Sequence, residues 1–414
     1  MPKKGLIMKK WIVCFLLVLL VTVLAVSCGK ESETTSATTS ATTSDETGIT
    51  TTVTTSEDTS DTTTAATNEA ALSYYPIREN TAYAVVDLGD FTGRDLVIPA
   101  IYNGLPVVEI GGYAFMECTS LHSVVLPDGI ESIGESAFAL CTELESVTLP
   151  NSVTAIGQRA FMGCEGLSSV TLSEKLAELP IECFKDCASL EKVTFGSGLA
   201  RIGDSAFVNC QSLTAIAIPE GVTNVSLSAF RGCPSLVSIT VDEKNAVYTA
   251  KGNCLILKEE KYLYLGCTGS VIPDDGSVTV IGEDAFWESG IESVTIPSCV
   301  TEIKNGAFFR CALLGSVTIE KGVQSIGWSA FDSCELIDEI VLPDSVTTVG
   351  WYVFSGCKAL VKIVIPASVS EFGANCFLEC AGLTIYCEAE SQPSAWEAEW
   401  NVTGLPVEWS YQAK

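Results

Sequence analysis

Cysteine is the residue of this chain whose number and spacing could most readily support chemistry. Ten of the 18 cysteines recur, in two series, at steps of 23 residues. They are Cys118, Cys141, Cys164, Cys187, Cys210 and Cys233, followed by Cys311, Cys334, Cys357 and Cys380. A tetrahedral metal site needs ligands that converge on one point, and residues placed one per repeat do not converge. A uniform series of thiols cannot pair neatly into disulfides either. The pattern therefore predicts small buried side chains, as free cysteines usually are.

Four of the eight cysteines outside this series also have an assigned role. Cys183 and Cys376 each precede a phenylalanine of the repeat, where most repeats have alanine, so we expect both in the core. Cys254 and Cys267 lie where the repeat is interrupted. These two are either buried thiols or the two halves of a disulfide.

Catalytic chemistry finds little support in the sequence. The only histidine, His122, falls in a variable position of a predicted strand, and no Ser/His/Asp set or metal cluster can be assembled around it. The acidic residues are scattered from repeat to repeat, without a pair in two distinct environments. We predict that His122 is a surface residue, that the chain is not an enzyme and that it uses no metal or cofactor.

The N-terminal segment has the layout of a secretory signal. Lysines precede an apolar run from Trp11 to Val26, which ends at Ala25-Val26-Ser27-Cys28. This ending resembles a bacterial lipobox, and the resemblance implies cleavage before Cys28 and lipidation of its thiol. An uncleaved membrane helix or an ordinary signal peptide is the alternative. A helix of about 16 residues would span only ~24 Å, which is short for a ~30 Å hydrocarbon core. We therefore expect residues 1–27 to be a lipoprotein signal peptide.

The composition then changes to threonine, serine, alanine and acids. Residues 28–72 have no periodic apolar face that could offset the entropy of ordering, so they are expected to form a disordered tether. The whole chain has a net charge of -28. Such an acidic surface makes nucleic acid and anionic membrane surfaces poor partners, so a lipid anchor is the only membrane contact expected.

The elements that position these side chains come from one repeated unit, AFxxCxxLxxVxLPxxVxxIGxx. Its phenylalanines recur mostly every 23 residues. They are Phe115, Phe138, Phe161, Phe184, Phe207, Phe230, Phe286, Phe308, Phe331, Phe354 and Phe377. A period of 20–29 residues with leucine-like residues at fixed positions is typical of a leucine-rich solenoid. We predict a right-handed leucine-rich repeat solenoid, α/β horseshoe-like and mostly β.

One copy of the unit shows how a coil should be built. Val147 and Leu149 alternate with Ser146 and Thr148, which predicts a strand with one buried face, stacked in a parallel sheet. The proline that follows ends the strand, and the glycine of the Ile-Gly pair, such as Gly157, is expected at a corner with positive φ. The Ala-Phe-x-x-Cys segment is expected to form a short helical turn.

The repeat also sets the predicted domain boundaries. An N-terminal cap is expected at 73–111, repeats at 112–241, a hairpin insertion at 242–271, further repeats at 272–387 and a C-terminal cap at 388–414. The insertion explains the 56 residues between Phe230 and Phe286, and its strands are expected to project from the solenoid. The caps follow because terminal repeats lack a neighbour on one side.

Aromatic residues in surface positions of the later repeats are the candidate ligand-binding residues. They are Trp287, Phe309, Trp328, Trp351 and Tyr352. Exposed aromatic side chains on adjacent coils could anchor a protein or sugar partner. Alternatively, they pack under the C-terminal segment with its Trp396, Trp400 and Trp409, which is the interpretation that the sequence favours. The serine- and threonine-rich sheet face is most simply ordinary strand surface.

With these residues in view, roughly residues 96 to 387 resemble the BspA-like (Treponema pallidum-type) leucine-rich repeat family. The insertion resembles a hairpin spacer of that family, and the segment from Ile385 to Trp396 resembles a closing segment of some members. Ser289 in place of the repeat cysteine, Leu179-Pro180 in place of Ile-Gly, and a one-residue deletion after Phe286 depart from the pattern. They put regular curvature near those coils in doubt, and not the fold.

The family resemblance implies a bacterial protein displayed on the cell surface that binds host or bacterial surface proteins or glycoproteins, as an adhesin does. From this and the lipobox-like ending at Cys28, we expect it to be lipid-anchored at the cell membrane. An architectural surface protein without a specific ligand is the alternative, and a lipoprotein that captures a solute is a weaker one.

Overall fold

The computed structural model describes residues 70–412. They belong to one compact unit. The predicted signal peptide, the lipidation site Cys28 and residues 28–69 of the predicted tether lie outside the described residues. Within residues 70–412, no helix is long and apolar enough to cross a membrane.

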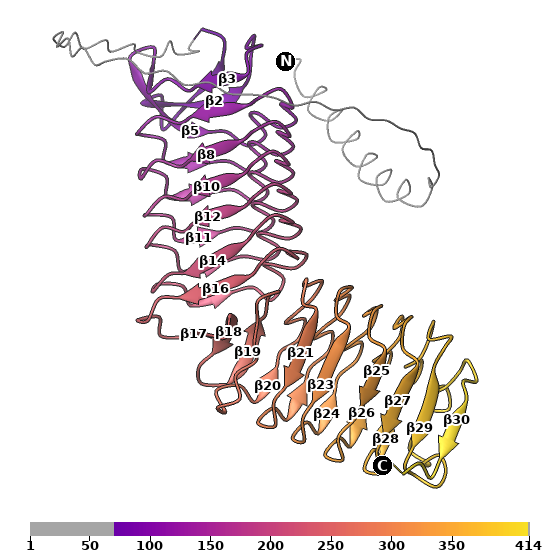
Figure 1. The fold of residues 1–414 in the computed structure, drawn as a ribbon. Helices are drawn as coiled ribbons and strands as arrows, with labels where there is room; N and C mark the ends of the chain where they lie inside the picture. Colours follow the sequence, from indigo (N-terminus) through magenta and orange to yellow (C-terminus); the bar gives the residue numbers. More distant parts are fainter. Residues whose placement is uncertain (1–69, 413–414) are drawn as a thin grey trace, which may run out of the picture. The chain divides into compact units, whose positions relative to one another are not determined.

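The described chain is a β-solenoid, in which each coil adds one strand to each of two rows (Figure 1). We call the first the long-strand row, because its strands have three or four residues in most coils. Before the insertion it consists of β3 (Asp95–Val97), β6 (Ser123–Val125), β8 (Ser146–Thr148), β10 (Ser169–Thr171), β12 (Lys192–Thr194), β14 (Ala215–Ile218) and β16 (Ser238–Val241). After the insertion it consists of β21 (Ser293–Ile296), β23 (Ser316–Ile319), β25 (Glu339–Val341), β27 (Lys362–Ile365), β29 (Thr384–Cys387) and β30 (Val407–Trp409).

The second row, the short-strand row, carries two residues of each regular coil. It begins with the longer strands β1 (Ser73–Ile77), β2 (Ala82–Asp87) and β5 (Leu105–Ile110), and β4 (Ile101–Tyr102) pairs with β5. It continues with β7 (Ser132–Ile133), β9 (Ala155–Ile156), β11 (Glu178–Leu179), β13 (Arg201–Ile202) and β15 (Asn224–Val225). After the insertion it contains β20 (Val280–Ile281), β22 (Glu302–Ile303), β24 (Ser325–Ile326), β26 (Thr348–Val349) and β28 (Glu371–Phe372).

The coils stack in register, so that equivalent residues lie beside one another. Val147 pairs with Val170, and Val170 pairs with Val193, all in parallel strands. Val147 is buried, whereas its neighbours Ser146 and Thr148 are exposed, as the alternation predicts. The leucine-rich solenoid with parallel sheets is therefore confirmed.

The repeat phenylalanines form a continuous buried column in each half of the solenoid. The Phe138 and Phe161 rings lie 5.2 Å apart with an interplanar angle of 2°, and the Phe308 and Phe331 rings lie 5.1 Å apart at 1°. Stacked rings of this kind exclude water from the centre of every coil. The column is the apolar core that aligns the coils.

All the repeat cysteines except Cys118 are buried beside this column. Each of these buried thiols donates a hydrogen bond to the phenylalanine carbonyl of the preceding coil, as Cys164 does to Phe138 at 3.1 Å and Cys334 to Phe308 at 3.1 Å. Cys118 lies in the first repeat, is partly buried and donates to the Met116 carbonyl instead. The 16 cysteines among residues 70–412 are free thiols, so the disulfide between Cys254 and Cys267 is not formed. Burial raises the pKa of the Cys233 thiol to about 12. The prediction of small buried side chains is confirmed for these buried cysteines, and their thiols also link each coil to the preceding one by a hydrogen bond.

The expected short helical turns are successive hydrogen-bonded turns, and residues 70–412 contain no helix. Two residues per coil explain this, because their left-handed backbone interrupts a helix. One lies two positions after the glycine, as at Ser136 (φ 51°), and the other two positions after the phenylalanine, as at Leu140 (φ 63°). The same two positions are left-handed in most coils.

The prediction that the Ile-Gly glycine needs positive φ is wrong. Neither Gly134 nor Gly157 has a positive φ. A Cβ on Gly157 would instead lie 2.3 Å from the backbone nitrogen of Glu135 in the preceding coil. The glycine is needed because two backbones approach closely at this corner.

The insertion does not project from the solenoid. Its strands β17 (Tyr248–Lys251), β18 (Cys254–Leu257) and β19 (Tyr262–Leu265) form an antiparallel meander, and β19 pairs in parallel with β20. The meander therefore begins the second part of the short-strand row. Cys254, Leu255 and Ile256 are buried in it, so this strand is part of the core.

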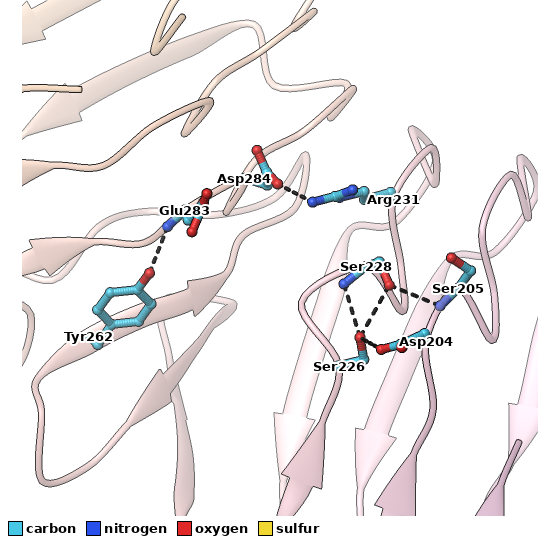
Figure 2. Close-up of polar contacts among 8 residues, drawn as sticks. All are labelled: Asp204, Ser205, Ser226, Ser228, Arg231, Tyr262, Glu283 and Asp284. Atoms are coloured by element: carbon cyan, nitrogen blue, oxygen red, sulfur yellow. Dashed lines mark hydrogen bonds and ion pairs between the residues drawn. The ribbon is translucent and has the colours of Figure 1, made fainter. Parts of the chain in front are cut away.

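Tyrosine hydroxyls connect the meander to the coils on either side. Tyr248 Oη accepts a hydrogen bond from the Val225 N–H at 3.1 Å, and Tyr264 Oη donates to the Val225 carbonyl at 2.6 Å. The Glu283 N–H donates to Tyr262 Oη at 2.7 Å (Figure 2). The two bonds to Val225 satisfy the backbone groups that β15 would otherwise leave open at the end of its sheet.

Candidate functional site

Trp328 and Trp351 follow the glycines that end the short strands β24 and β26. Because the two coils stack in register, the indoles lie 5.6 Å apart with an interplanar angle of 17°. Trp328 is 58% exposed, Trp351 43% and the adjacent Tyr352 37%. We call these three residues the aromatic patch.

Glycines of the following coils make room for the two indoles. A Cβ on Gly350 would lie 2.6 Å from Trp328 Cδ1, and a Cβ on Gly373 would lie 2.3 Å from Trp351 Cδ1. One edge of each indole is therefore seated on backbone, while much of the ring faces solvent. Seating of this kind limits the rotamers that binding would otherwise have to freeze.

Polar neighbours fix the rest of the patch. The backbone N–H of Trp328 donates to Asn305 Oδ1 at 2.9 Å, and Asn375 Nδ2 donates to Tyr352 Oη at 3.2 Å. Asn305 occupies the position of Trp328 one coil earlier, and Ala374 occupies that of Trp351 one coil later. The stacked indoles are therefore two coils tall.

The C-terminal segment does not cover the patch, so the interpretation favoured by the sequence is wrong for these residues. Trp396 packs on Phe372 with ring centroids 5.1 Å apart, and Trp400 lies 6.2 Å from Phe377. Trp396 and Trp400 are buried there and close the last coil of the phenylalanine column. Trp409 completes this cluster at 6.1 Å from Trp396.

Trp287 and Phe309, which we call the junction pair, lie in a different environment. Their rings are 4.3 Å apart and partly buried. The Arg231 guanidinium lies over Trp287 at 4.7 Å, and the Arg310 guanidinium lies over Phe309 at 5.1 Å. The structure thus does not unite all five candidate residues in one site.

Arg231 also forms an ion pair with Asp284 (Figure 2). Arg231 belongs to the last coil before the insertion and Asp284 to the first regular coil after it, so the pair joins the two parts of the solenoid. Burial raises the pKa of the Asp284 carboxyl, and the Arg231 charge opposes this rise. The long gap between Phe230 and Phe286 was the only sequence signal for such a contact.

The neighbours of His122 in the described structure are one acid and one arginine. His122 lies directly before β6 and is partly exposed, with its Nε2 3.3 Å from Glu145 Oε2 and its Nδ1 3.4 Å from an Arg94 guanidinium nitrogen. No group of three or more His, Cys, Asp or Glu side chains in residues 70–412 could hold a metal ion.

Known proteins resemble this chain in fold and repeat. The family described as the BspA type leucine rich repeat region (6 copies) matches residues 108–246 and 260–386, which is more than half of the chain. No curated protein matches it.

Among solved structures, a leucine rich cell surface protein from Faecalibacterium prausnitzii is 26% identical, with 83% of this chain and 97% of that chain covered and a TM-score of 0.60. A leucine-rich repeat protein from Eubacterium ventriosum is 22% identical, with 83% and 94% covered and a TM-score of 0.58. The pneumococcal vaccine antigen PcpA is 19% identical, with 82% and 96% covered and a TM-score of 0.59. With its repeat, its solenoid and this match, the chain belongs to the BspA-type leucine-rich repeat family.

Proposed function

We propose that this chain is a bacterial surface lipoprotein that binds a protein or glycoprotein partner through the aromatic patch, in the manner of an adhesin. The observation that carries the proposal is the pair of stacked, exposed indoles of Trp328 and Trp351. Tryptophan and tyrosine are the side chains most enriched among residues that dominate binding energy, because they bury large area at small entropic cost. A protein gains nothing in stability from leaving such side chains in water.

Two further facts support this function over others. The net charge of -28 disfavours nucleic acid and anionic lipid as the partner. The relative from Faecalibacterium prausnitzii, which is covered almost completely, is described as a cell surface protein. Surface display of this chain agrees with both.

Attachment to the membrane rests on Cys28. We expect the mature chain to begin with a diacylated Cys28, because two acyl chains give the stable anchoring that one does not. Metabolic labelling with a radioactive fatty acid, followed by fractionation, tests this. The Cys28→Ala variant should lose both label and membrane association. Label that persists in this variant would contradict the assignment.

The partner is sought with the full chain in detergent micelles on an array of matrix proteins, plasma glycoproteins, mucins and bacterial surface glycoproteins. Trp328→Ala/Trp351→Ala is compared with the control Val341→Ala/Val361→Ala, which shortens two exposed apolar side chains of nearby coils, one on β25 and one directly before β27. A saturable signal that only the tryptophan variant loses supports the proposal. A signal that both variants keep would place binding elsewhere. No saturable signal at all would favour an architectural surface protein.

A further inference from the structure

The long-strand row is broken where the insertion begins. Its first sheet ends at β16 and its next sheet begins at β21, and β21 pairs only with β23 among the described strands. The chain between β19 and β20, residues 266–279, contributes no strand to this row. One edge of β21 is therefore left without a neighbouring strand in residues 70–412.

The regular coils show which backbone groups lie on that edge. The carbonyl of the third strand residue faces the preceding coil and accepts a bond there, as Thr171 does from Leu149 N–H at 3.0 Å and Thr194 from Leu172 N–H at 3.0 Å. The equivalent residue of β21 is Thr295. The residue directly before the strand donates its N–H to the preceding coil, as Gly315 does to the Glu292 carbonyl. In the coil of β21 the equivalent residue is Glu292. The Thr295 carbonyl and the Glu292 N–H thus point toward the missing strand.

A groove lies along this edge. Its volume is about 840 Å³, which is in the roughly 300–1,000 Å³ range of ligand sites. It is lined by residues of the segment 291–297, which contains β21, and by the segment 268–274. Lys251 and Gly252 also line it, and the Gly252 carbonyl accepts a hydrogen bond from the Val271 N–H at 2.8 Å. Val271 is 72% exposed, so an apolar side chain borders the groove without a partner in the described chain.

The short-strand row shows that an open edge is not forced by the insertion. There the Tyr248 and Tyr264 hydroxyls satisfy Val225 at the end of β15, and β19 continues the row to β20. The long-strand row has no such closure at β21. Open strand edges pair readily with other extended chains, which is how β-augmentation binds peptides.

The charge at the groove selects among extended chains. Asp274, Glu292 and Glu320 are exposed at its lining, and its only cation, Lys251, is paired with Asp275. A cationic segment is therefore attracted. The chain's own segment 28–72 carries acids such as Glu31, Glu33 and Asp45 and is repelled.

We propose that this groove binds an extended, cationic peptide segment of a partner protein as an added strand on β21. Alternate side chains of the peptide would face the acids of the rim and Val271, and its backbone would bond to Thr295 and Glu292. This site is separate from the aromatic patch, so either proposal can fail without the other.

The test uses the full chain in detergent micelles and a fluorescein-labelled ten-residue peptide of alternating lysine and valine, followed by fluorescence anisotropy. Three further probes are the same peptide with glutamate in place of lysine and two versions N-methylated on alternate residues, one for each edge. We expect saturable binding of the lysine peptide, at least tenfold weaker binding of one N-methylated version, and no binding of the glutamate peptide. Equal binding of both methylated versions and the parent would overturn strand addition.

Matched variants locate the site. Glu292→Lys/Glu320→Lys should weaken lysine-peptide binding at least tenfold. Glu145→Lys/Glu191→Lys makes the same charge change in the position of Glu292 on coils whose strands are paired on both sides, and should change binding less than twofold. Equal losses in both pairs would mean general attraction to an acidic surface and overturn the site. Binding that appears only when residues 29–69 are deleted would mean that the chain's own segment occupies the groove, which also contradicts the proposal.

Discussion

The aromatic patch and the junction pair are built from the same kinds of side chain on nearby coils, yet their surroundings differ. Trp328 and Trp351 stack 5.6 Å apart, and 58% and 43% of their surfaces are exposed to solvent. The Trp287 and Phe309 rings lie 4.3 Å apart, tilted by 38°, beneath the guanidinium groups of Arg231 and Arg310. The difference is a cation supplied to each ring of the junction pair. Contact between two rings therefore does not distinguish a binding site from a structural pair, and our proposal rests on the absence of a cover over Trp328 and Trp351 among the described residues.

The buried column beneath both pairs sets the scale for their contributions to stability. Phe331→Ala removes a fully buried ring that stacks on Phe308 and Phe354, so it should lower the free energy of unfolding by about 3–5 kcal/mol. Urea denaturation of the full chain measures this. A loss below about 1 kcal/mol would mean that the column does not hold the coils together.

The junction pair should contribute less than the column but clearly more than the patch. Trp287→Ala removes a partly buried ring and leaves Arg231 without its aromatic contact, and we expect a loss of about 1–3 kcal/mol. The same denaturation experiment checks it. If Trp287→Ala and Trp328→Ala cost equally little, the distinction between the two pairs fails.

The ion pair at the junction predicts a pH dependence. Burial raises the pKa of Asp284 in the folded chain above its ordinary value of 3.8. The native state then holds the proton more tightly than the unfolded state, so this group's contribution to stability falls as pH rises from the ordinary value through the raised one. Its slope is at most about 1.4 kcal/mol per pH unit, the value for one proton.

Two variants isolate that contribution in the pH dependence of unfolding. Arg231→Gln removes the charge that lowers the Asp284 pKa, so the fall should extend to higher pH. Asp284→Asn should abolish it. The pH profiles are compared with that of Arg310→Gln, whose cation lies on Phe309 and pairs with Glu288. A profile that is identical in Arg231→Gln and Arg310→Gln would contradict a special role for the Arg231–Asp284 pair.

The smallest effect on stability is expected at the aromatic patch. Trp328→Ala should change the free energy of unfolding by less than about 1 kcal/mol, because most of its ring is already in water. Thermal melting of the single and double variants measures this. A loss as large as that of Trp287→Ala would show that Trp328 is a structural residue.

The sequence allowed the repeated parts of the fold to be predicted because each coil has the same neighbours. The positions of Phe138, Cys164 and Val147 in the core follow from their period and alternation alone. The role of Gly157 was missed because the close approach depends on the backbone of the preceding coil, at Glu135. Leu140 adopts a left-handed backbone conformation, and a leucine side chain does not indicate such a conformation.

The non-repeating parts could not be predicted in the same way. The sequence allows Trp396 to pack on Trp351 or elsewhere. The packing of Trp396 on Phe372, which the sequence does not show, leaves Trp351 uncovered. The meander strands were readable, but their pairing was not, since β19 joins β20 across a long connection. The open edge of β21 depends on how the chain after the meander is placed. The groove could therefore not be predicted from the sequence either.

The most direct test of the account is the affinity of the strongest array partner for three forms of the full chain. Trp328→Ala/Trp351→Ala should raise the Kd at least tenfold, or about 1.4 kcal/mol, while its melting temperature stays close to that of the parent. Trp287→Ala/Phe309→Ala should lower the melting temperature but leave the Kd of the folded protein within twofold. The opposite pattern, in which the junction variant loses binding and the patch variant keeps it, would contradict the assignment of the aromatic patch as the binding surface.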